Sequence, residues 1–365
     1  MRVTLCVDAL QPQLTGVGRY TWELCTRLPR RSEISSLRFY GRRSLVHDPG
    51  ILMRQPRPQW YWRQLWRLAA PLGSAVLRST LVHGPNYFLP LQVRSGIITV
   101  HDLSVFRYPE SHPAARVFAF ERLFASSLAR ASHVITDSDT IRRELIETFS
   151  VSPHRVSVVP LGVDNNFHPI TTSDLERDLK HWDLRPGHYG LSVATFEPRK
   201  NIRQLIAAWS RLPPAVRNRF PLVLAGGAGW RNQELLEAIA RGASDGWLRN
   251  LGFVADRDLP KLYAGARLFL YPSSYEGFGL PPIEAMASGV PVVVSNRSCL
   301  PEICGEAARY IDPDDDDGFT RVIAESLFDD AWRSATIERG LKRSGQFTWG
   351  RCIEGTVAAY NRVAS

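Results

Sequence analysis

Short apolar segments alternate with helical patterns along the chain, and this alternation restricts the fold more than any other feature. In the first half, the apolar runs are typical of buried strands, at residues 3–7, 38–40, 81–83, 97–100, 133–136 and 156–159. Helices are expected between several of them, at residues 19–28, 115–130 and 139–149. Because strands separated by helices form parallel sheets, the pattern predicts a doubly wound α/β domain.

The alternation restarts in the second half. Strands are expected at residues 191–194, 222–225, 268–271, 290–294 and 308–311, with helices at 202–212, 232–240, 260–264 and 282–287. A polar segment, residues 170–180, lies between the halves and marks the best domain boundary. We therefore predict two Rossmann-like domains, residues 1–168 and 169–346, followed by an amphipathic closing helix in residues 347–365.

Composition narrows the class of protein. The chain is 44% hydrophobic and 22% charged, as in an ordinary globular protein, and its five cysteines form no Cys-x-x-Cys pair that would indicate zinc or a disulfide framework. The N-terminal apolar run is too short for a signal peptide, and no stretch is long enough to span a bilayer. These features predict a cytoplasmic protein.

The net charge of +9 lies entirely in the first half, where residues 1–170 hold 21 arginines, no lysine and 12 acidic residues. Such a field can attract nucleic acid, an anionic membrane or an anionic substrate. Nucleic-acid binding requires base-stacking or groove-reading motifs, and we find none. Within residues 54–78, Trp62 and Trp66 share one helical face and Arg63 and Arg67 another. This pattern suits an interfacial membrane helix or a packed helix with solvated arginines, and the basic surroundings favour the membrane.

Residues 271–289 combine a strand end, a glycine-bearing loop and a helix start. Glu276 lies in the loop and Glu284 in the first turn of the helix, and backbone N–H groups around Gly277 and Gly279 form an anion site with the helix N-terminus. A loop that holds phosphate while two carboxylates accept hydrogen bonds from hydroxyls suits a sugar nucleotide.

Other candidate site residues follow strands as well. His101 and Asp102 end an apolar strand, at the edge where open α/β sheets bind ligands; the alternative is a structural pair that caps a helix. Arg199 and Lys200 lie between a strand and a helix, where they can neutralise a diphosphate or form an exposed basic turn.

Two weaker signals complete the candidate set. Gly16 and Gly18 open a helix, either as a diphosphate-binding turn or as a tight turn alone, and the backbone at Phe253 and Val254 is a candidate for reading a nucleobase.

The triplet Asp137-Ser138-Asp139 matches the D-x-D pattern of metal-dependent glycosyltransferases. Ser138 or Asp139 also fits the N-cap of the following helix, and we favour that interpretation. No metal site is therefore predicted.

Together these residues resemble the retaining glycosyltransferases of family 4, which have the GT-B fold of two Rossmann-like domains facing a cleft. The resemblance rests on residues 271–289, on Glu197-Pro-Arg-Lys-Asn201, on residues 160–164 and on His101-Asp102. It implies that the segment beginning at Phe347 returns to the N-terminal domain. The variant at residues 197–201 is similar to a bacterial branch that transfers mannose or rhamnose from GDP-sugars in lipopolysaccharide O-antigen or exopolysaccharide synthesis.

The resemblance also implies roles. Glu276 is expected to hold hydroxyls of the donor sugar, Glu284 those of the ribose, and Lys200 the diphosphate. His101 is expected at the reacting centre of an acceptor-binding domain. Further diphosphate contacts are expected from backbone groups of Gly16, Gly277, Phe278, Gly279 and Leu280.

One position departs from the family pattern, because many members have an arginine where this chain has Ala194. Arg199 is the candidate to supply that charge. We expect a metal-independent hexosyltransferase, peripheral at the inner face of the cytoplasmic membrane, with a saccharide or lipid-linked saccharide acceptor. A UDP-sugar-dependent transferase of the same fold remains the alternative.

Overall fold

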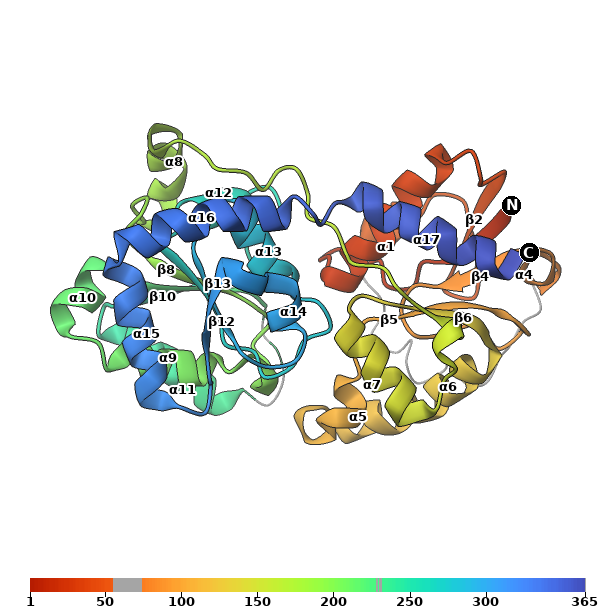
Figure 1. The fold of residues 1–365 in the computed structure, drawn as a ribbon, viewed down its shortest axis with the longest axis horizontal. Helices are drawn as coiled ribbons and strands as arrows, with labels where there is room; N and C mark the ends of the chain where they lie inside the picture. The colour runs from red at the N-terminus through yellow and green to blue at the C-terminus, as the bar shows by residue number, and fades with distance from the viewer. Residues whose placement is uncertain (55–73, 228, 230–231, 365) are drawn as a thin grey trace. The chain divides into compact units, whose positions relative to one another are not determined.

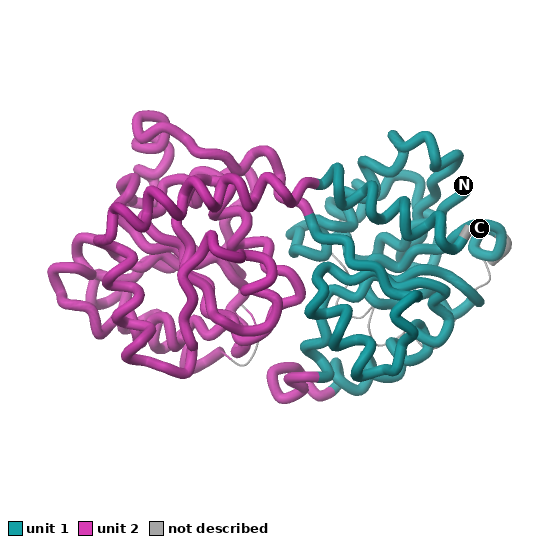
Figure 2. The backbone as a smooth tube through the Cα atoms, viewed as in Figure 1, with its two compact units in different colours: residues 1–106, 115–161, 349–365 teal, residues 107–114, 162–348 magenta. Residues whose placement is uncertain are grey.

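The computed structural model describes the chain except for residues 55–73, 228, 230–231 and 365. The chain forms two compact units (Figure 2). The first comprises Met1–Phe106, Ala115–Leu161 and Trp349–Ser365, and the second comprises Arg107–Ala114 and Gly162–Thr348. Each unit is an α/β domain built on its own sheet, which confirms the predicted fold class.

The first unit contains a seven-stranded sheet in the order β3-β2-β1-β4-β5-β6-β7. All neighbouring strands are parallel except β2 and β3, which form an antiparallel pair at one edge. The strands are β1 (Arg2–Cys6), β2 (Ser36–Gly41), β3 (Ser44–Val46), β4 (Leu81–Gly84), β5 (Gly96–Val100), β6 (Ala131–Thr136) and β7 (Val156–Val158). The helices are α1 (Gly16–Arg27), α2 (Ile51–Arg54), α4 (Ser74–Ser79), α5 (Ser104–Arg107), α6 (Ala114–Arg130), α7 (Asp139–Phe149) and α17 (Trp349–Ala364).

The C-terminal helix α17 belongs to this first unit, although the chain before it belongs to the second. It packs against α1 and β6 (Figure 1). The Tyr360 hydroxyl lies 2.8 Å from Nδ1 of His83 in β4, and both side chains are fully buried. This hydrogen bond joins α17 to the centre of the first sheet.

The second unit contains a six-stranded, fully parallel sheet in the order β10-β9-β8-β11-β12-β13. The strands are β8 (Gly190–Val193), β9 (Leu222–Ala225), β10 (Leu248–Gly252), β11 (Leu268–Tyr271), β12 (Val292–Ser295) and β13 (Ala308–Ile311). The helices are α8 (Thr172–Leu179), α9 (Ile202–Ser210), α10 (Pro214–Arg219), α11 (Gln233–Ser244), α12 (Leu259–Ala264), α13 (Leu280–Ala287), α14 (Leu300–Cys304), α15 (Asp316–Phe328) and α16 (Asp330–Ser344).

Helices cover both faces of this second sheet: α8, α12, α13 and α16 lie on one face and α9, α11 and α15 on the other (Figure 1). Short 3-10 turns connect several elements, at η1 (Leu28–Arg30), η2 (Pro109–Ser111), η3 (Pro153–Arg155), η4 (Lys180–Trp182), η5 (Pro198–Lys200) and η6 (Gly305–Ala307).

Each sheet reverses its strand order once, between β1 and β4 in the first unit and between β8 and β11 in the second. Open α/β sheets bind ligands at the carboxyl ends of the strands beside such a reversal. In the second unit, the loops at this place are those that follow β8 and β11. These loops contain Arg199, Lys200 and Glu276.

The packing of β8 yields a test of the fold. A Cβ atom added at Gly190 would lie 2.2 Å from the ring of Trp209, which is fully buried. Gly190→Ala should therefore lower the free energy of unfolding by about 1–3 kcal/mol, as overpacked cores do. Gly227→Ala is the control, because a Cβ atom there meets nothing within 4 Å. Equal denaturation midpoints for the two variants would contradict this packing.

Candidate active site

The loops after β8 and β11 bring Lys200 and Glu276 into direct contact. The Lys200 ammonium donates one hydrogen bond to Oε1 of Glu276 and another, of 2.9 Å, to the Tyr271 hydroxyl. Lys200 and Glu276 are each only 7% exposed. Buried charges persist in proteins when they are paired and hydrogen-bonded, and both conditions hold here.

Arg199 extends this pair into a cluster. Its Nε atom donates to Glu197 at 3.1 Å, and its Nη1 atom donates to the Tyr275 carbonyl at 2.8 Å and lies 3.4 Å from Oε2 of Glu276. We call Glu197, Arg199, Lys200 and Glu276 the switch-point cluster. It contains two cations and two carboxylates, so its formal charges balance.

The backbone around η5 explains how the cluster is positioned. Asn201 has a left-handed conformation, with φ of 52°, which asparagine tolerates better than most residues. Its side-chain amide donates to the Pro272 carbonyl at 3.0 Å and to the Ser274 hydroxyl at 2.6 Å. The Ser273 hydroxyl donates to the Arg199 carbonyl at 3.1 Å. These bonds join the two loops, so Lys200 and Glu276 are held by the same network.

Burial and charge act in opposite directions on the cluster. Burial alone would raise the pKa of Glu276, but Lys200 and Arg199 outweigh it and hold that pKa below its usual value. Burial lowers the pKa of Lys200, and the Arg199 guanidinium lowers it further, while Glu276 opposes both effects. Glu276 is therefore ionised at neutral pH, and Lys200 depends on its acidic neighbours to keep its charge.

Glu284 lies in α13 beyond the first turn, where the sequence had placed it, because the helix begins at Leu280, before the two prolines. Gly279 precedes this helix with φ of 92°, and a Cβ atom there would lie 2.9 Å from Leu300, so the turn requires glycine. Oε2 of Glu284 accepts a 2.9 Å hydrogen bond from the buried Tyr263 hydroxyl. The Phe278 side chain is buried, so this residue can offer a ligand only its backbone.

In the first unit, β4, β5 and β6 lie side by side and end at one edge of the sheet. The register pairs Val100 with Thr136, which makes the next residues, His101 and Asp137, neighbours. His101 Nδ1 lies 2.7 Å from Asp137 Oδ2, and its Nε2 lies 2.8 Å from the Pro85 carbonyl oxygen. Both ring nitrogens of His101 are therefore engaged.

The residues around His101 have structural roles. Ser138 caps α7 by accepting a hydrogen bond from the Ile141 N–H at 3.3 Å, as the sequence predicts. Asp139 pairs with two arginines of α7. Asp102 accepts hydrogen bonds from the backbone and hydroxyl of Ser104 at the start of α5, so the helix-capping alternative applies to Asp102.

The weaker candidates receive less support. The Gly18 N–H points to the Thr15 hydroxyl oxygen, at 3.4 Å, as part of the α1 cap, and its contact with a diphosphate stays a prediction. Gly16 is the first residue of α1. After the edge strand β10, Phe253 is 48% exposed and Val254 is buried.

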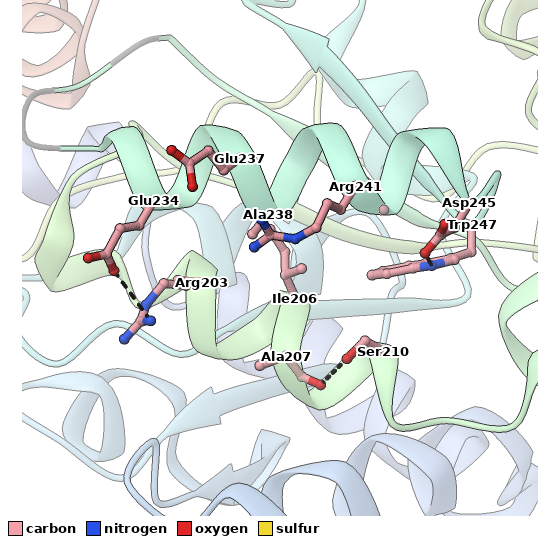
Figure 3. A pocket seen from close by; sticks show the side chains of 11 residues that line it. Arg203, Ile206, Ala207, Ser210, Glu234, Glu237, Ala238, Arg241, Asp245 and Trp247 are labelled. Carbon is pink, nitrogen blue, oxygen red and sulfur yellow. Dashed lines mark hydrogen bonds and ion pairs between the residues drawn. The ribbon is translucent and has the colours of Figure 1, made fainter.

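A surface groove of about 520 Å³ lies between α9 and α11 in the second unit (Figure 3). Arg203, Glu234, Arg241 and Trp247 line it, and none of the predicted site residues does. A nearby groove of about 860 Å³ includes Glu197. The candidate site is therefore defined by its charged network and its place at the strand reversal rather than by these grooves.

The sequence did not single out Tyr263, Tyr271 or Asp137 for the contacts they make. Tyr271 is the last residue of a strand, and that position could have signalled a partner for Lys200. The pairing of Asp137 with His101 could have been inferred from two adjacent strands that both end in a charged or titratable residue. Tyr263 lies in an apolar helix and has no such signal.

Family models cover most of the chain. One described as Glycosyltransferase Family 4 matches residues 14–167, and one described as Glycosyl transferases group 1 matches residues 186–343. The chain is a family 4 glycosyltransferase. It is a hexosyltransferase, which confirms the enzyme class predicted from the sequence.

This transferase is 38% identical to O-antigen chain mannosyltransferase B of Escherichia coli, over 99% of both chains. It is 30% identical to O-antigen chain mannosyltransferase RfbU of Salmonella typhimurium, over 72% of this chain and 69% of that protein. Its fold matches the Anabaena protein HepE, solved in complex with UDP and glucose, with a TM-score of 0.76, 19% identity and 99% of both chains covered.

In the described part of the transferase, no helix is both long and apolar enough to cross a bilayer.

The switch-point cluster predicts that Lys200 is required for turnover. Lys200→Ala should lower kcat/KM by about 100-fold or more, because it removes the one lysine in the cluster. The control is Lys261→Ala, which removes a partly exposed partner of Asp178 and should leave kcat/KM close to wild type. Steady-state kinetics and thermal melts of both variants test this. Wild-type turnover in a folded Lys200→Ala protein would refute the assignment.

The Tyr263 hydroxyl predicts a narrower effect. Tyr263→Phe should raise KM for the donor about two- to tenfold, because Glu284 loses a hydrogen bond that orients it. Tyr189→Phe removes another buried hydroxyl of the same unit, one that donates to the Leu262 carbonyl at 2.6 Å. It should change stability without changing the donor KM. An equal rise in KM for both variants would show that Glu284 is not involved.

Proposed function

We propose that this transferase moves a mannosyl residue from a GDP-linked donor to a saccharide acceptor in O-antigen synthesis. The observation that carries the proposal is the 38% identity, over 99% of both chains, to an O-antigen chain mannosyltransferase. A second O-antigen mannosyltransferase at 30% identity supports the same sugar and process. The two relatives favour mannose over rhamnose.

The geometry supports a division of roles among the site residues. Glu276 and Tyr271 use two of the three ammonium N–H bonds of Lys200, which leaves one to donate to a diphosphate oxygen. Glu276 would accept hydrogen bonds from sugar hydroxyls, and Glu284, oriented by Tyr263, would accept them from ribose. Arg199 supplies a guanidinium next to Lys200. It provides the positive charge that many family members have from an arginine at the position of Ala194.

Transfer with retention needs the new bond to form on the face that the diphosphate leaves. The bond between the anomeric carbon and the phosphate oxygen breaks, the acceptor oxygen bonds to that carbon, and the acceptor proton passes to the departing phosphate. Cations that stabilise the departing diphosphate lower this barrier. Arg199 and Lys200 are the two cations that the switch-point cluster offers for this purpose.

We propose that the reaction needs no divalent metal at the Asp-Ser-Asp triplet. Asp137 is committed to His101 and Asp139 to the arginines of α7, so the two carboxylates serve different partners. Among the described residues, no group of three acidic, histidine or cysteine side chains is placed to hold a metal ion.

We further propose that the acceptor is lipid-linked and that the transferase binds the inner face of the membrane. The arginine excess of residues 1–170 supports this, since anionic lipids attract basic surfaces. The tryptophan–arginine segment that suggested it lies outside the described residues. Co-sedimentation with anionic vesicles at low salt tests the proposal, and protein left in the supernatant would contradict it.

A donor screen tests the proposed function. The protein is assayed with GDP-mannose, GDP-rhamnose, UDP-glucose and UDP-GlcNAc, following hydrolysis, transfer and the melting temperature. GDP-mannose should give the largest rise in melting temperature and the fastest turnover, because a ligand that binds the native state stabilises it. Turnover should persist in excess EDTA. A preference for a UDP-sugar, or complete loss of activity in EDTA, would overturn the corresponding part of the proposal.

A further inference from the structure

The His101 ring lies among the ends of three adjacent strands of the first sheet, and the two outer strands each supply one group to it. His101 follows β5, Asp137 follows β6, and the Pro85 carbonyl follows β4. His101 is 7% exposed and Asp137 2% exposed. The two groups that face the ring nitrogens are a carboxylate and a carbonyl. A neutral imidazole has one N–H and one acceptor nitrogen, so it cannot donate to both.

The other oxygen of Asp137 strengthens this reasoning. Oδ1 of Asp137 is buried and has no hydrogen-bond partner among the described residues, so the contact with His101 is the one that offsets the carboxylate charge. A buried carboxylate without a cation is strongly unfavourable. Burial raises the pKa of Asp137, and the Asp137 and Pro85 contacts hold the pKa of His101 above its usual value. Because an imidazole is ordinarily a stronger base than a carboxyl group by roughly two to three pH units, the shared proton resides on the histidine.

We propose that Asp137 is a positioning residue that holds His101 as an imidazolium, with both N–H bonds committed to fixed acceptors. The ring then cannot remove the proton of an acceptor hydroxyl. It acts as an oriented cation at the reacting centre instead. This inference rests on the proposed function and on the family resemblance, from which His101 is expected at the reacting centre.

The other groups around the His101 ring are compatible with a protonated imidazolium. The rings of Tyr20 and Tyr87 approach His101 edge-on, with centroids 5.1 Å and 5.9 Å away. Asp102 lies next in the chain and favours a positive ring. His83 in β4 stays neutral, because burial lowers its pKa to about 3 and the charge on His101 adds to the effect.

The protonation state is linked to stability. Burial alone would lower the pKa of His101, but Asp137 and the Pro85 carbonyl outweigh it and hold this pKa above its usual value. A raised folded pKa means that the contribution to stability is complete below about pH 6.5, the usual value for histidine, and is lost as the pH rises through the folded value. The stability gap between wild type and a variant without the carboxylate should therefore narrow at alkaline pH.

Nitrogen-15 NMR of the histidine rings tests the inference directly, with His101→Gln used to assign the signals. Both His101 nitrogens should give imidazolium shifts at pH 7.5 in the wild-type protein. A neutral ring, or an unprotonated Nδ1, would overturn the proposal. This measurement needs no substrate, so its result stands even if the donor screen refutes mannosyl transfer, and it remains decisive if an Asp137 variant fails to fold.

A matched pair of variants tests the consequence for the reaction. Asp137→Asn should lower the titration midpoint of His101 by about one to three pH units, because the opposite charge is lost. It should also reduce kcat about tenfold or more, with the donor KM unchanged. Asp139→Asn, in the same triplet, should change none of these. Wild-type kcat in an Asp137→Asn protein with a neutral His101 would overturn the positioning role.

Discussion

The contact between Lys200 and Glu276 is the interaction on which the candidate site of the second unit depends. Two buried charges are tolerated at this place because they meet each other, with Arg199 and Glu197 completing a balanced cluster. The strand reversal brings the two loops together, and Asn201 and Ser273 hold them in register. A sugar nucleotide that binds as proposed must exchange partners with this ion pair: phosphate takes the lysine, and hydroxyls take the carboxylate.

In the first unit, polar side chains buried at the edge of the sheet are likewise paired with each other. His101 and Asp137 follow two neighbouring strands and pair as buried groups at the carboxyl edge. By our inference they carry opposite charges. In both units the paired side chains hold one another in position in the absence of substrate. Polar groups that are already positioned at a site favour the stabilisation of charge that develops during a reaction.

The sequence predicted both sheets well, because their central strands are short apolar runs that cannot be mistaken for surface loops. It missed β3 and β10, which are edge strands with partly exposed side chains and weaker apolar patterns. The candidate residues Arg199, Lys200 and Glu276 were found because they follow strands. Their mutual pairing was not, since a sequence shows that charges are present but not which of them touch. The same limit explains why the sequence presents Asp137 as part of a possible metal-binding triplet and not as a partner of His101.

Calorimetric binding of GDP and of GDP-mannose to wild type and to Glu276→Gln tests the exchange of partners at the Lys200–Glu276 pair. The variant leaves Lys200 beside an uncharged group of nearly the same shape. It should bind GDP at least as tightly as wild type does, because phosphate no longer competes with a carboxylate, and should bind GDP-mannose with a smaller advantage over GDP. Equal weakening of the binding of both ligands would contradict this exchange of partners.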